Sequence, residues 1–92
     1  MALRRLAITI SGRVHGVGFR LFSRDAATHL GLTGWVRNSP HRTVDMEIQG
    51  EGSMVELYCD RVRQGPRLAH VENVSITEIP VREIELSFDI VH

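Results

Sequence analysis

One stretch decides the fold: residues 6–30, which read LAITISGRVHGVGFRLFSRDAATHL. Branched apolar residues occupy every second position of residues 6–10, a period of two that is typical of a half-buried strand. Residues 11–18 hold three glycines and therefore predict a loop. From Phe19 the apolar residues recur with helical spacing, and Gly31 stands where a C-terminal helix cap is expected. This stretch predicts a strand, a glycine-rich turn and a helix.

The rest of the chain supplies the other strands. Residues 33–38 and 44–49 read as two strands, and apolar and polar residues alternate strictly in the second of them. A turn beginning at Ser39-Pro40 is expected to join them into a hairpin. Residues 71–79 predict a fourth strand with broken alternation, and residues 85–91 are able to add a short fifth one.

A second helix lies between these strands. Ser53 is expected to cap it, with Glu56 at the capping-box position, and Gly65-Pro66 ends it. Its apolar stripe consists of Val55, Tyr58, Cys59 and Val62. The order strand–helix–strand–strand–helix–strand predicts one domain over residues 1–92. We expect a ferredoxin-like α+β sandwich, a four- to five-stranded antiparallel sheet with two helices on one face.

Composition excludes several kinds of chemistry. All 11 residues counted as Lys or Arg are arginine, so the chain has neither a Schiff-base lysine nor a Walker-type phosphate loop. The formal net charge is zero, which argues against a broad basic surface for nucleic acid. The lone Cys59 cannot form an internal disulfide and favours a reducing compartment, the cytoplasm. The apolar stretch at residues 6–10 is too short for a signal peptide or a membrane span.

Two features are candidates for a site. Glycines between a strand and a helix let successive backbone N–H groups point at one anion, and Arg20 in the first helical turn adds a planar fork of donors. The same glycines are compatible with a turn that binds nothing. Asn38 ends the second strand at the same edge of the domain. It is either a turn-forming residue or a second polar group of the site.

Two longer motifs carry a family resemblance. Residues 11–20 read SGRVHGVGFR and residues 30–38 read LGLTGWVRN. They resemble the two signatures of the acylphosphatase family, of the form GRVxGVxFR and GLxGWVxN, and they stand at the family's spacing. The similarity continues to Phe88 and so covers essentially the whole chain.

The resemblance implies an enzyme that hydrolyses acyl phosphates to carboxylate and inorganic phosphate without metal or cofactor. Arg20 matches the family's phosphate-binding arginine, and Asn38 matches the asparagine that holds the attacking water. The resemblance also implies that backbone N–H groups bind the phosphate, here those of His15, Gly16, Val17, Gly18, Phe19 and Arg20. A free-standing cytoplasmic monomer is expected, with no nucleic-acid or membrane partner.

Two departures from the family pattern stand beside the site. His41-Arg42 replaces the Asp-Gly that the family commonly has after the asparagine, so we expect the turn to take another geometry. His15 stands where the family often has glutamine. We expect its backbone N–H to be the useful part, with the side chain exposed or supporting the loop.

Other interpretations fit the sequence less well. The five histidines show no metal-ligand spacing, and Cys59 is expected in the core. Two groups of acidic residues are expected to be solvated: Asp45 with Glu47, and Glu78 with Glu83 and Glu85. An RNA-recognition domain shares the fold, but its signature belongs on the third strand. An accessory module of carbamoyl-transfer proteins typically has proline after the arginine, whereas Leu21 follows Arg20 here. An inactive relative remains a further alternative.

Overall fold

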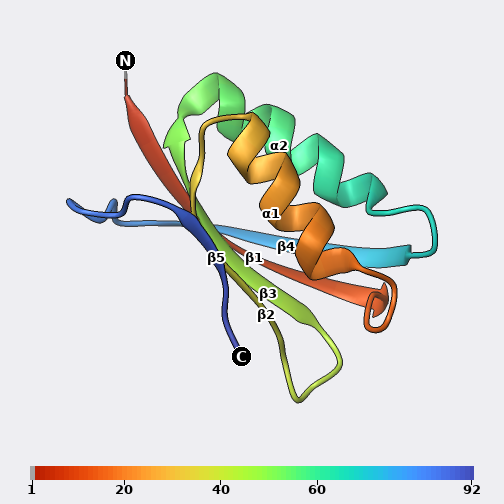
Figure 1. The fold of residues 1–92 in the computed structure, drawn as a ribbon. Coiled ribbons are helices and arrows are strands. Elements are labelled where there is room, and N and C mark those ends of the chain that lie inside the picture. The colour runs from red at the N-terminus through yellow and green to blue at the C-terminus, as the bar shows by residue number, and fades with distance from the viewer. Residues whose placement is uncertain (1) are drawn as a thin grey trace.

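The computed structural model describes residues 2–92, so Met1 of the predicted domain lies outside the described residues. Seven elements follow one another: β1 (Leu3–Arg13), α1 (Phe19–His29), β2 (Thr33–Asn38), β3 (Val44–Glu51), α2 (Gly52–Gln64), β4 (His70–Ile79) and β5 (Phe88–Ile90). Both helices pack on the same face of one sheet (Figure 1). The predicted ferredoxin-like α+β fold is confirmed.

The strand order of the sheet is β4-β1-β3-β2-β5. β1 pairs antiparallel with β3 and β4, and β2 pairs antiparallel with β3. β5 pairs with β2 in parallel, so the five-stranded sheet is mixed rather than purely antiparallel. The reason is topological. The chain reverses after β4 and crosses to the opposite edge, where β2 already runs opposite to β4.

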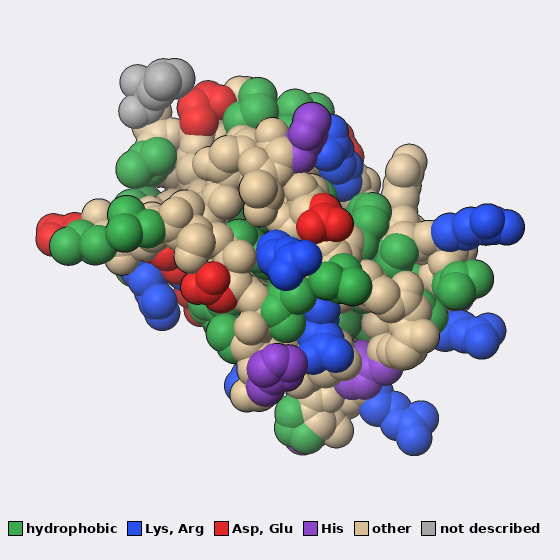
Figure 2. Space-filling model, viewed as in Figure 1, with side chains coloured by type: hydrophobic (Ala, Val, Ile, Leu, Met, Phe, Trp, Pro, Cys, Tyr) green, Lys and Arg blue, Asp and Glu red, His purple; other side chains and the backbone are tan. Residues whose placement is uncertain are grey.

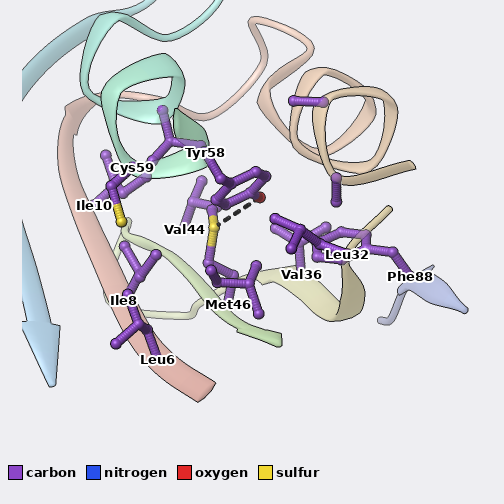
Figure 3. Close-up of a cluster of buried hydrophobic side chains, with 14 of the residues drawn as sticks. Leu6, Ile8, Ile10, Leu32, Val36, Val44, Met46, Tyr58, Cys59 and Phe88 are labelled. Atoms are coloured by element: carbon purple, nitrogen blue, oxygen red, sulfur yellow. Dashed lines mark hydrogen bonds between the residues drawn. The ribbon is translucent and has the colours of Figure 1, made fainter. Parts of the chain in front are cut away.

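The core lies between the sheet and the two helices. The inward side chains of β1 and β3 meet the apolar stripe of α2, as Figure 3 shows for Ile10, Val44, Met46 and Tyr58. The buried Tyr58 hydroxyl donates a hydrogen bond to Met46 Sδ over 3.2 Å. Cys59 is buried as predicted, and burial raises the pKa of its thiol.

Glycine ends the first helix, α1. Gly31 follows α1 with φ +71°, and the N–H groups of Gly31 and Leu32 donate back to the carbonyls of Thr28 and Ala27. This Schellman pattern confirms the predicted C-terminal cap.

The predicted capping box of α2 is wrong. The helix begins at Gly52, and the Glu51 side chain accepts hydrogen bonds from the N–H and the hydroxyl of Ser53. Glu56 instead pairs with Arg4 over 2.7 Å. A carboxylate one residue before the helix satisfies an unpaired N–H of the first turn as well as a serine at Ser53 would.

An ionic cluster fills part of the other face of the sheet. The Arg5 side chain is fully buried and donates to Glu47 Oε1 over 2.9 Å and to Glu85 Oε1 over 2.7 Å. Glu85 is only 13% exposed and Glu47 21%, so the prediction that both are solvated is wrong. Glu85 belongs to the segment that returns from β4 to β5, and the alternation of β3 gives no sign of that cover.

Candidate active site

The loop from β1 to α1 is pinned by buried residues at both ends. Val14 is 1% exposed and Phe19 is 2% exposed. Between them Gly16 has φ +71° and Gly18 has φ +79°, a left-handed backbone that glycine adopts without strain. Figure 1 shows this loop leading directly into α1. The glycines are therefore required by the path of the chain.

The N-terminus of α1 is open toward this loop. Gly18 is its N-cap, no side chain caps it, and no acidic residue stands in its first turn. The first N–H groups of a helix have no partner inside the helix, and the helix dipole places partial positive charge there. The loop and the helix end together offer backbone donors to an anion.

A hollow of about 120 Å³ lies at this place. It is lined by Val14, Gly16, Gly18, Phe19, Arg20, Leu21 and Asn38. Arg20 is half-buried and forms no ion pair with any described residue. Asn38 is the last residue of β2, and its side chain makes no hydrogen bond to the described residues. The hollow therefore joins a guanidinium, a carboxamide and a helix N-terminus.

The turn after Asn38 keeps the geometry that suits glycine. Arg42 N–H donates to Ser39 O over 3.1 Å, and Ser39 N–H donates to Thr43 O over 2.8 Å. Arg42 has φ +66°, the left-handed conformation that glycine adopts without strain. The expectation of another turn geometry assumed that a residue other than glycine avoids this backbone, and Arg42 adopts it. An arginine takes a conformation that costs a side-chain-bearing residue about 1–2 kcal/mol.

The His15 side chain joins the loop to this turn. Its Nε2 lies 2.7 Å from Thr43 O, the carbonyl that also accepts from Ser39 N–H. Because a carbonyl only accepts, Nε2 carries the proton of this hydrogen bond. Asn38 directly precedes Ser39, so this contact links the β1–α1 loop to the strand end that carries Asn38.

The structure brings together most of the predicted site residues. Gly16, Gly18, Phe19, Arg20 and Asn38 line one hollow, whereas Val17 belongs to the same loop without lining it and His15 lines a neighbouring hollow. Val14 and Leu21 line the hollow and were not predicted as site residues. Their positions inside and next to the glycine motif were the available signal. Within residues 2–92, no group of three or more His, Cys, Asp or Glu side chains is arranged to hold a metal ion.

Comparison with known proteins identifies the family of this chain. Residues 6–90 match the family model described as Acylphosphatase. The chain belongs to the acylphosphatase family. It is 40% identical over 90 residues to the acylphosphatase of Geobacillus thermodenitrificans, a match covering 98% of this chain and 96% of that protein.

Solved acylphosphatase structures have the same fold. The acylphosphatase from Bacillus subtilis superposes with a TM-score of 0.93 at 32% identity, over 99% of this chain and 100% of that one. Full-length HypF, in a phosphate- and nucleotide-bound form, matches with a TM-score of 0.92 at 29% identity. That match covers 99% of this chain but 12% of HypF, so the fold also occurs inside a much larger protein. Over residues 2–92, no helix is both long and apolar enough to cross a membrane.

Proposed function

We propose that this chain, as an acylphosphatase, hydrolyses acyl phosphates in the hollow between the β1–α1 loop and the end of β2. The observation that carries the proposal is that Arg20 and Asn38, distant in sequence, line one hollow at the uncapped N-terminus of α1. Family membership supports the reaction class, and the hollow supports the place. In this proposal the β1–α1 loop, residues 14–18, is a phosphate-binding loop within a single domain.

Arg20 and the backbone N–H groups bind the phosphoryl oxygens. The proposed donors are the N–H groups of His15, Gly16, Val17, Gly18, Phe19 and Arg20. Negative charge spreads over these oxygens as the phosphoryl group is transferred, and donors held in fixed positions stabilise that charge. The planar guanidinium contacts two oxygens at once, which a point charge does not do.

Asn38 orients the water in line with the phosphorus. A carboxamide both donates and accepts, so it holds a neutral water without adding charge beside the phosphate. The water oxygen forms a bond to phosphorus while the bond from phosphorus to the acyl oxygen breaks. The leaving carboxylate has a conjugate acid of pKa about 4 and departs without a general acid. The water proton passes to a phosphoryl oxygen, which leaves inorganic phosphate and carboxylate.

No metal or cofactor enters this mechanism. Arg20 and the helix N-terminus supply the positive charge that a cation would otherwise supply. Turnover of benzoyl phosphate, followed by loss of its ultraviolet absorbance, is therefore expected to be unchanged by EDTA. Inorganic phosphate is expected to inhibit competitively, because it occupies the same donors.

Two substitutions test the assigned roles. Arg20→Ala is expected to lower kcat/KM by about 10²–10³, the scale for losing a preorganised oxyanion donor. Asn38→Ala is expected to lower kcat more than it raises KM, because the water contributes mainly to the transition state. Arg24→Ala is the matched control, since Arg24 lies one turn along α1 and does not line the hollow. Near-normal rates in both Arg20→Ala and Asn38→Ala would contradict the mechanism.

A folded chain without turnover would favour the alternative, an acylphosphatase-like binding module. Phosphate binding by calorimetry then separates the two: the binding module retains it, whereas an unrelated function does not. We further propose a cytoplasmic monomer, which the single buried Cys59 supports through the lack of a disulfide partner. Light scattering coupled to gel filtration measures the oligomeric state.

A further inference from the structure

A second hollow adjoins the proposed active site. It measures about 400 Å³ and is lined by Gly12, Arg13, Val14, His15 and Arg42. Val14 lines both hollows, so the two are contiguous around one buried side chain. The lining combines the end of β1 with the β2–β3 turn, and the His15–Thr43 hydrogen bond holds these two segments together.

The second hollow carries unneutralised positive charge. Arg13 and Arg42 are exposed, and neither forms an ion pair with a described residue. Glu72 approaches Gly12 from β4, but it lies beyond 4.0 Å of both guanidinium groups. Asp45, near the turn, is already engaged by Thr43 Oγ1 at 2.9 Å and by Arg37 at 3.6 Å. Figure 2 shows arginine side chains projecting from the end of the molecule where these loops lie.

The backbone of Arg42 is a second, independent observation. Its φ of +66° is strained for arginine, and glycine would relieve that strain. Strained residues that persist are concentrated at functional sites. Here the strain sets an arginine at the rim of a hollow beside the phosphate loop.

The volume of the first hollow limits how much of a substrate it encloses. At about 120 Å³ it is far smaller than the roughly 300–1,000 Å³ of pockets that enclose whole ligands, so most of an acyl group must lie outside it. We propose that Arg13 and Arg42 bind a second anionic group, a carboxylate or phosphate, on the acyl part of the substrate. The substrate class is thus the acyl phosphates of anionic acids, and the inference rests on the function proposed above.

Two substrate analogues separated by one charge test the inference. Benzoyl phosphate is compared with its 3-carboxy and 4-carboxy derivatives at low ionic strength. We expect kcat/KM for at least one carboxy derivative to be about three- to tenfold higher, the scale of exposed pairs with two arginines. Half-molar salt is expected to remove the preference, because it screens exposed charges.

Variants then locate the preference. The double variant Arg13→Ala with Arg42→Gly is expected to abolish it while turnover of benzoyl phosphate changes less than about twofold. Arg67→Ala is the matched control. Arg67 is exposed, forms no ion pair with the described residues and does not line the hollow. It lies in the α2–β4 connection, whose Gly65 approaches Phe19. It tests whether any arginine at this end of the molecule has the same effect.

The outcomes are distinguishable. Equal kcat/KM for all three substrates, or a preference that survives the double variant, would overturn the inference and leave the proposed function intact. A preference lost equally in Arg67→Ala would reduce the second hollow to a general positive field and would also overturn it. Failure of the wild-type chain to hydrolyse any of the three compounds would overturn the proposed function and this inference together.

Discussion

Arg5→Met is expected to be among the most destabilising single changes outside the hydrophobic core. The side chain is fully buried on the face of the sheet away from the helices. It donates four hydrogen bonds, to Glu47, Gln49 and both oxygens of Glu85. Methionine fills much of the same volume, so the substitution mainly removes the charge and the donors. It leaves the carboxylates of Glu47 and Glu85 without the arginine that they share.

The magnitude follows from the burial of the two carboxylates. Removing one partner of a buried ion pair costs roughly 3–5 kcal/mol, because the other charge is left uncompensated. Glu85 is 13% exposed, whereas Glu47 is 21% exposed and reaches water more easily, so we expect about 3 kcal/mol. For a domain whose total stability is on the order of 5–15 kcal/mol, this is a large fraction.

Acid weakens the effect of the substitution on stability. Burial raises the pKa of Glu85, but the hydrogen bonds from Arg5 and Thr33, together with the charges of Arg5 and Arg82, outweigh it and hold that pKa below the usual 4.5. The pair therefore contributes stability above about pH 4.5, and this stability is lost as the pH falls through the lower folded-state pKa. In Arg5→Met the effect of Arg5 is lost while burial, the Thr33 hydrogen bond and the Arg82 charge remain, so the pKa of Glu85 rises above its value in the unaltered chain. The difference between the two proteins is expected to shrink from pH 7 to pH 4.

Urea unfolding followed by circular dichroism at pH 7 and pH 4 measures both effects. With a slope of about 1–3 kcal/mol per molar for small proteins, the midpoint at pH 7 is expected to fall by about 1–3 M. Adding Glu85→Gln to Arg5→Met is expected to recover part of the loss, because the uncompensated charge is gone. A loss under about 1 kcal/mol at pH 7, or a difference that does not depend on pH, would refute the reasoning.

Three further predictions concern the hydrogen bonds and strain around the loops. His15→Ala is expected to lower kcat several-fold with little change in phosphate inhibition. His15→Gln is expected to restore kcat, because its amide donates to the Thr43 carbonyl; equal kinetics in the two variants would contradict this. Glu51→Ala removes the cap of α2 and is expected to cost about 1 kcal/mol in thermal or urea unfolding, whereas Ser53→Ala costs less. Arg42→Gly relieves a positive φ at the expense of unfolded-chain entropy and is expected to leave stability unchanged or raise it by up to about 1 kcal/mol; a loss of that size would show that the side chain holds the turn.

The parts of the fold that sequence predicts are those set by local chemistry. The strand Thr33–Asn38 and the Schellman end of α1 follow from short-range patterns of apolar residues and glycine. The cap of α2 depends on a choice between Glu51 and Ser53, which both supply a suitable oxygen. Such competition between adjacent residues is decided by a shift of one residue in the helix start, which no pattern specifies.

Long-range features escaped prediction because they depend on where distant segments meet. Alternation along β3 places Glu47 on the face away from the helices, and nothing in that pattern shows that the 80–87 segment covers the same face. The parallel pairing of β5 follows from the path of the same segment. The second hollow likewise depends on Arg13 and Arg42 lining the same place. The hydrogen bond that holds their two segments together joins His15 to Thr43, which are 28 positions apart in sequence.

The proposed site could be outlined from sequence because its chemistry uses few side chains and much backbone. A reaction with a good leaving group needs donors held in place more than it needs acids and bases. The fold supplies that rigidity: Val14 and Phe19 anchor the loop in the core, and His15 fastens it to the turn beyond Asn38. Val14 lines the hollow, and its side chain has no polar atom. Truncating it is therefore expected to impair turnover by displacing the backbone donors around it. Because Val14 also lines the second hollow, its truncation is expected to lower the preference for anionic acyl groups as well, which the carboxy derivatives of benzoyl phosphate measure.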